Sequence, residues 1–159
     1  MVGIIDGDTI DVLYQNTQIR VRLYGVDCPE KSQAFGTKAK QETSSLVFGH
    51  IVTVVPLKQE TYNRIVAHIK REDGAELSTE LVRKGMCWWY EKYAPKDAEL
   101  KALETAAKKA KIGVFQDPHA TPPSEFRHPK KKKEKVVGEG YYWSPKTPPF
   151  TKPEQISTN

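Results

Sequence analysis

The chain has 159 residues, 38% hydrophobic and 28% charged, which is enough for one domain with a modest core. No apolar run approaches the length of about 18 residues that a membrane span needs, and the N-terminus lacks the basic-then-apolar pattern of a signal peptide. Two cysteines, Cys28 and Cys87, are too few for a disulfide framework, and four scattered histidines argue against a structural zinc site.

The net charge of +5 lies entirely in the C-terminal part of the chain. Residues 1–126 contain 17 basic and 17 acidic residues, whereas residues 127–159 contain eight basic and three acidic ones. We therefore predict a 1–126 domain followed by a basic, proline-rich tail over 127–159. Because the domain is neutral overall, any binding of an anionic polymer by it must depend on local clusters of charge.

The first 70 residues are predicted to be mainly β-structure. Apolar residues recur at every second position over 10–12 and 19–23, with polar residues between them, which predicts a β-hairpin. For the apolar sides of both strands to coincide, paired residue numbers should add to an odd value, about 33. Two further strands are expected, one over 51–55 that ends at Pro56 and one over 64–70.

Three helices are predicted among and after these strands. They run from a cap at Ser32 to about Phe48, from Leu77 to Gly85, and from Pro95 to just before Gly113. The inward face of the third helix is expected to hold Leu100, Leu103, Ala107 and Ala110. Repeated prolines after Phe115 predict no regular structure there. Strands followed by interspersed helices favour an α+β arrangement, a small closed β-barrel that carries helices.

Two acidic segments are predicted to meet at one end of this barrel. Asp6-Gly7-Asp8-Thr9 begins the hairpin, and Gly25-Val26-Asp27-Cys28-Pro29-Glu30 follows its second strand. The first segment alone is also ordinary turn chemistry. Together they bring four carboxylates to one end with no lysine inside either segment, which is costly unless a proton or a cation lies between them. Calcium or magnesium, with oxygen ligands, suits such a cluster.

Two arginines extend the candidate site. Arg22 points away from the core, and it either pairs with Asp11 across the hairpin or reaches a ligand near the carboxylates. Its fork of donors suits a phosphate. Arg64 follows Tyr62-Asn63 at the start of a strand and, taken alone, is an ordinary solvated strand end. Metal-binding carboxylates, a spare glutamate and two arginines together suit hydrolysis of a phosphodiester.

These segments occur in the order and spacing of the staphylococcal nuclease (thermonuclease-like) family, which the chain resembles over residues 2–126. Residues 80–85, 88–90 and 113–115 also look like bacterial members of that family. The resemblance implies an OB-type five-stranded barrel with about three α-helices. It also implies a calcium-dependent endonuclease that cleaves DNA and RNA with little sequence preference and leaves 3′-phosphate ends.

The resemblance implies roles for the acidic residues. Asp8 and Asp27 would bind one calcium ion together with the backbone carbonyl of Cys28, and Asp6 would lie behind these ligands. Glu30 would orient or deprotonate the attacking water.

It also implies roles for two arginines and two tyrosines. Arg22 and Arg64 would bind the scissile phosphate and stabilise the transition state, and Tyr62 and Tyr90 would line the nucleotide site. Thr61 stands where a basic residue is often found, which would weaken phosphate binding.

Two other functions stay open. Some members of such a family have lost catalysis and bind nucleic acid or protein, and the carboxylates of an OB-type binder could hold a structural cation only.

We expect a monomer that acts on single-stranded DNA or RNA and contacts no membrane. The family is often exported, so a secreted or periplasmic location stays open. Cys28 is expected to be partly exposed and Cys87 buried, and Lys130–Lys133 either bind polyanions or are solvated.

Overall fold

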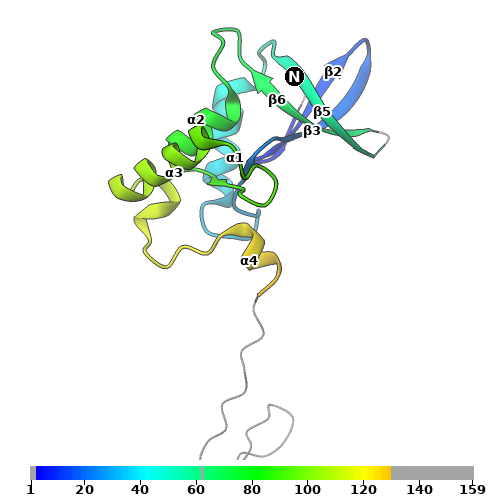
Figure 1. Ribbon diagram of the computed structural model, residues 1–159. Helices are drawn as coiled ribbons and strands as arrows, with labels where there is room; N and C mark the ends of the chain where they lie inside the picture. The colour runs from blue at the N-terminus through cyan, green and yellow to red at the C-terminus, as the bar shows by residue number, and fades with distance from the viewer. Residues whose placement is uncertain (1–2, 62, 130–159) are drawn as a thin grey trace, which may run out of the picture. The chain divides into compact units, whose positions relative to one another are not determined.

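The computed structural model describes residues 3–61 and 63–129 (Figure 1). They form an α+β fold, as predicted, with a mixed five-stranded sheet in the order β1-β2-β3-β6-β5 and a small sheet of β4 and β7. All pairs are antiparallel except β3 with β6. The strands are β1 (Gly3–Asp6), β2 (Thr9–Tyr14), β3 (Thr17–Leu23), β4 (Val26–Asp27), β5 (Thr53–Thr61), β6 (Arg64–Lys70) and β7 (Trp88–Trp89).

The helices are α1 (Gly36–Val47), α2 (Leu77–Arg83), α3 (Ala98–Ala110), the 3-10 turn η1 (Gly113–Gln116) and α4 (Pro123–Arg127). The compact unit that contains them extends to His128, so α4 belongs to it. The run Lys130–Lys133 and the rest of the predicted tail lie outside the described residues. Within the ranges that are described, no helix is long and apolar enough to cross a membrane.

The predicted hairpin is present, but its register differs by two. Ile10 pairs with Val21 and Val12 with Ile19, so paired numbers add to 31. The odd value expected from the alternating pattern is correct, whereas the predicted value of about 33 is wrong. The cause is a turn of only two residues, Gln15 and Asn16, both with positive φ, as in tight hairpin turns. Polar residues 17 and 18 therefore belong to β3.

The predicted end of a strand at Pro56 is wrong, because β5 continues to Thr61. It is an edge strand, where a missing N–H need not break a ladder, and its pairing with β6 shifts between Pro56 and Lys58. The strand predicted over 64–70 is confirmed as β6.

The helices differ from expectation mainly at their ends. The first begins at Gly36 rather than after Ser32, because Phe35 takes a left-handed conformation there. The third begins at Ala98, where the Asp97 side chain accepts from the Leu100 N–H at 3.0 Å, and its last residue, Ala110, is exposed rather than inward.

Residues 123–127 form a short helix where none was predicted. Proline is compatible with the first turn of a helix, because the N–H that it lacks has no partner there in any case. α4 thus begins at Pro123, which is buried.

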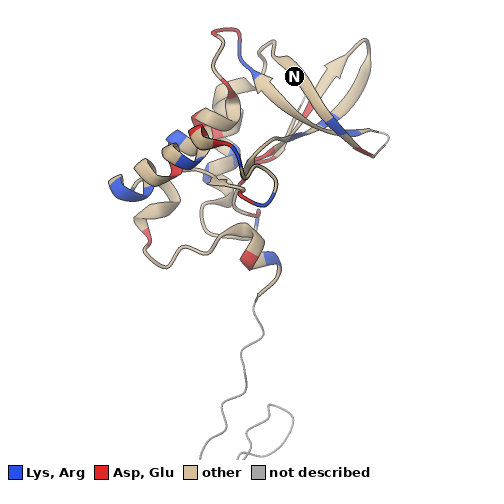
Figure 2. Cartoon of the chain, viewed as in Figure 1, with Lys and Arg blue, Asp and Glu red and all other residues tan. Residues whose placement is uncertain are grey.

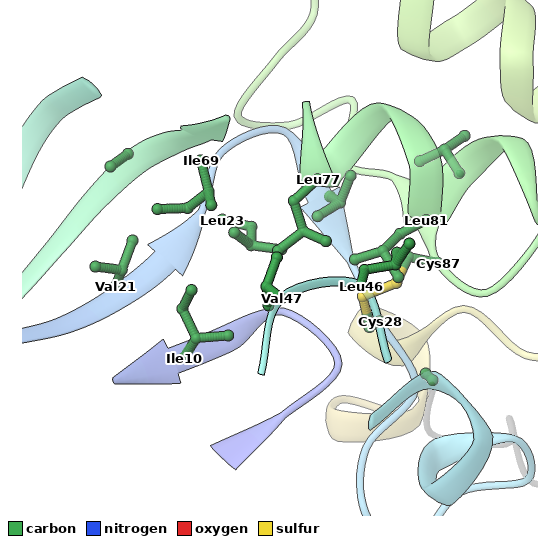
Figure 3. Packing of buried hydrophobic residues seen from close by; sticks show 14 of the residues in the cluster. Ile10, Val21, Leu23, Cys28, Leu46, Val47, Ile69, Leu77, Leu81 and Cys87 are labelled. Carbon is green, nitrogen blue, oxygen red and sulfur yellow. A yellow bond between two sulfur atoms is a disulfide. The ribbon is translucent and has the colours of Figure 1, made fainter. Parts of the chain in front are cut away.

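The core lies between the sheet and the helices (Figure 3). It contains Ile10, Val21, Leu23 and Ile69 from the sheet, Leu46 and Val47 from α1, and Leu77 and Leu81 from α2. Cys28 and Cys87 form a disulfide beside Leu46 and Leu81 (Figure 3). The expectation that Cys28 is partly exposed is therefore wrong, since it is 3% exposed.

Candidate functional site

The turn between β1 and β2 holds Asp6 and Asp8 at a fixed place on the molecule. The Gly7 carbonyl accepts from Thr43 Oγ1 of α1 at 2.7 Å, and the Asp8 N–H donates to Asp6 Oδ1 at 3.2 Å. A Cβ atom on Gly7 would lie 2.8 Å from the Cβ of Cys28, so only glycine allows this close approach. The turn is thereby packed against the segment that carries Asp27.

The second acidic segment is held from two sides. Val26 and Asp27 pair with β7, and the disulfide joins the next residue, Cys28, to Cys87 just before β7. On the other side, the Cys28 N–H donates to Asp8 Oδ2 at 2.8 Å. These attachments place the Asp27 carboxylate near that of Asp8, as the sequence predicts.

Arg22 lies between the two buried carboxylates. Its Nη2 is 3.3 Å from Asp8 Oδ2 and 3.2 Å from Asp27 Oδ1. The alternative pairing of Arg22 with Asp11 is wrong: the register places Arg20 opposite Asp11, with Nε 2.9 Å from Asp11 Oδ1. Burial raises the pKa of Asp8 to about 7 against the opposing charge of Arg22. Burial therefore disfavours the charged form of this carboxylate, and a further cation beside it would favour that form.

A second guanidinium, that of Arg127 at the end of α4, reaches Asp27 and also Glu30. Its Nη1 and Nη2 donate to Asp27 Oδ1 and Oδ2 at 3.1 and 3.0 Å, and Nη1 also donates to Glu30 Oε1. The hydrogen bonds to Asp27 raise the Arg127 pKa above its usual range. Sequence reasoning missed this contact. It joins residues 100 apart in the chain, and no local pattern marks the arginine.

The acidic cluster has the chemistry of a site for a hard cation. In residues 3–61 and 63–129, no three His, Cys, Asp or Glu side chains gather as a metal site. However, Asp8 and Asp27 are buried and both approach the same guanidinium nitrogen, so a positive charge already holds them together. Two carboxylates completed by backbone carbonyls and water are a usual calcium environment. The residues present therefore fit such an ion.

A pocket of about 810 Å³ lies beside these carboxylates. Among the residues that line it are Arg22, Glu30, Arg64 and Tyr90, four of those predicted for the site, and Arg127 of α4, a helix with charges of both signs (Figure 2). Tyr62, also predicted, lies outside the described residues.

Within this pocket, Arg64 is anchored by a neighbour on β5. Its Nε lies 2.8 Å from Glu60 Oε2, and its side chain is 40% exposed. The guanidinium is therefore held at the pocket while part of it stays open to a ligand. The pocket combines arginines, a carboxylate and aromatic rings, which suits a nucleotide with its phosphate.

The chain is similar in sequence to one protein family and to several known proteins. The model of a family described as staphylococcal nuclease homologue matches residues 20–117. The chain is 36% identical over 130 residues to an uncharacterized endonuclease of Escherichia coli, covering 82% of this chain and 84% of that protein. It is 36% identical over 140 residues to the micrococcal nuclease of Shigella flexneri, covering 82% and 80%. An uncharacterized endonuclease of Haemophilus influenzae is 37% identical over 132 residues, covering 82% and 73%.

Proposed function

The chain belongs to the staphylococcal nuclease family, and from that premise we propose that it is a calcium-dependent endonuclease of single-stranded DNA and RNA. The observation that carries the proposal is the gathering of two arginines and a glutamate in one pocket, next to two buried carboxylates. Few other reactions need this combination. We propose low sequence preference and 3′-phosphate products, as the family resemblance implies.

In this proposal, Glu30 activates the attacking water. Its side chain is 32% exposed at the pocket, so water can reach the carboxylate, which accepts the proton as the water attacks phosphorus. The bond from phosphorus to the 5′-oxygen breaks, and the leaving oxygen takes up a proton from solvent. Arg22 and Arg64 bind the phosphate oxygens and stabilise the charge that develops on them in the transition state. The two guanidiniums come from neighbouring strands, β3 and β6, which pair in parallel and so hold both in a fixed relation.

Asp8, Asp27 and the backbone carbonyl of Cys28 would hold the calcium ion. When bound, such an ion polarises the phosphate and offsets its negative charge. Asp6 supports these ligands through the hydrogen bond from the Asp8 N–H.

Tyr62 and Tyr90 would contact the nucleotide. Support for Tyr90 comes from its place in the pocket and from its edge-on packing against Tyr93, with ring centroids 4.8 Å apart. A ring held in this way can stack on a base without sequence preference. We also propose that the five-stranded sheet curls into the OB-type barrel of the family and that the protein acts as a monomer.

The proposal is tested by digestion of single-stranded DNA and of RNA with calcium, with magnesium alone and with a chelator. We expect cleavage with calcium and its loss with chelator, because Asp8 and Asp27 repel each other less when a divalent cation offsets their charge. The 3′ ends of the products identify which phosphodiester bond breaks. Tight binding of DNA without cleavage under any condition would favour the binding module instead.

Substitution of Arg64 tests its role in the transition state. We expect Arg64→Ala to lower the maximal rate by roughly 10²–10³-fold, as loss of one well-placed donor does elsewhere. Its ion pair with Glu60 is half-exposed, so the thermal unfolding midpoint should change little. The matched control is Arg71→Ala, which removes a comparable ion pair with Asp73 outside the pocket. An unchanged rate in Arg64→Ala would exclude this role.

A further inference from the structure

The guanidinium of Arg127 contacts Asp27, one of the two carboxylates that the proposed mechanism assigns to the cation, and Glu30, which it assigns to the water. It binds the two oxygens of Asp27 at 3.1 and 3.0 Å and also donates to Glu30. Asp27 is 2% exposed, and its Oδ1 also accepts from Arg22. Both oxygens of this carboxylate therefore already accept from a guanidinium, and a cation that binds both of them would displace one.

The guanidiniums of Arg22 and Arg127 both contact Asp27 and repel each other. This repulsion is stronger in a buried site than in water, and it favours the release of one of them. Arg22 is held in the sheet, because it lies on β3 where that strand pairs with β6. Arg127 lies on a helix of five residues outside the sheet, near the end of the described chain. Of the two guanidiniums on Asp27, that of Arg127 is the one that can leave.

Polar contacts hold α4 at the site together with the buried Pro123. Besides the ion pairs of Arg127, Gln33 Nε2 donates to the carbonyl of Thr121 just before the helix. The same side chain accepts from the Glu30 N–H at 3.2 Å, so Gln33 joins the acidic segment to the approach of α4. Short exposed segments held in this way open at low free-energy cost. The arrangement is that of a strap that can be released.

We propose that α4 is an autoinhibitory strap: in its docked position Arg127 neutralises Asp27 and Glu30, and calcium binds by displacing it. The inference rests on the proposed function, because that proposal assigns Asp27 to the cation and Glu30 to the attacking water. In the docked state the guanidinium of Arg127 occupies Oε1 of Glu30, so water competes with it for that oxygen. Release of the strap removes the Arg127 contacts from Glu30 and from both oxygens of Asp27 in the same step.

Calcium affinity tests this directly. We would titrate calcium into the full chain and its Arg127→Ala variant by isothermal calorimetry, without nucleic acid. If nine in ten molecules hold the strap docked, its removal should tighten the apparent calcium affinity by about tenfold. The matched control is Arg83→Ala, which removes an arginine ion-paired with Glu80 on α2, away from the pocket. The thermal midpoints of all three proteins report whether they are folded.

Hydrogen exchange gives a second readout in the unmodified chain. The amides of Glu125, Phe126 and His128 are hydrogen-bonded within the α4 segment, so they should exchange faster when calcium is added and the strap is released. Magnesium at equal ionic strength controls for salt.

The outcomes separate the two proposals. Tighter calcium binding by Arg127→Ala, with faster exchange over 123–128 in the unmodified chain, supports the strap. Equal or weaker binding by the variant, or slower exchange with calcium, overturns it and makes Arg127 a residue that holds the ligands in place. If neither protein binds calcium, the proposed cation site and the strap both fail. If calcium binds as expected but DNA is not cleaved, only the nuclease proposal fails.

Discussion

Glu30→Gln is expected to reduce the hydrolysis of single-stranded DNA by roughly 10²–10⁴-fold, the usual range for loss of a general base. Glutamine keeps the size of the side chain and can still accept a hydrogen bond from Arg127, but it cannot take a proton from water. The expected loss is therefore in the maximal rate rather than in DNA binding. Initial rates at saturating DNA, together with DNA affinity in the presence of a chelator, measure the two separately.

The matched control for this variant is Glu72→Gln, an exposed glutamate in the turn after β6 and outside the pocket. It loses the same charge but should keep the full rate. Retention of full activity by Glu30→Gln would remove this residue from the mechanism. A rate that falls equally in both variants would point to overall charge rather than to proton transfer.

The sequence predicts the acidic end of the site well because local patterns determine it. Alternating apolar residues decide which face of β3 is buried, so Val21 and Leu23 point inward and Arg22 does not. That argument holds for any odd register, which is why Asp8 and Asp27 both reach Arg22 although the register differs by two. The exact partner of Arg22 depends on the turn length, and polar residues 17 and 18 gave no sign that they continue the strand.

Contacts between distant segments could not be predicted in the same way. Arg127 reaches Asp27 because α4 returns to the pocket, and nothing in a proline-rich stretch indicates that course. The disulfide of Cys28 and Cys87 is similar, since two cysteines 59 residues apart carry no spacing rule. Both depend on the path of the chain after the sheet is complete. Sequence patterns describe single elements, whereas these contacts come from how the elements pack.

Loss of the disulfide is expected to lower the free energy of unfolding by about 2–4 kcal/mol, because the cross-link closes a long loop and restricts the unfolded chain. Urea denaturation of the protein with and without a thiol reductant measures this. The Cys28→Ala, Cys87→Ala double variant should be less stable than the oxidised wild-type protein, and its free energy of unfolding should not change with reductant. Reduced wild-type protein keeps both sulfur atoms in the core, so its difference from the variant separates packing from the cross-link itself.

Reduction should affect stability more than the geometry of the site. The Asp27 segment keeps two other attachments, the pairing of β4 with β7 and the hydrogen bond from the Cys28 N–H to Asp8, so it can stay in place while the protein is folded. We therefore expect the reduced protein to keep its calcium affinity at low temperature and to lose it at a lower temperature than the oxidised form. A large loss of calcium affinity on reduction, with the protein still folded, would instead assign the disulfide a direct part in shaping the cation site.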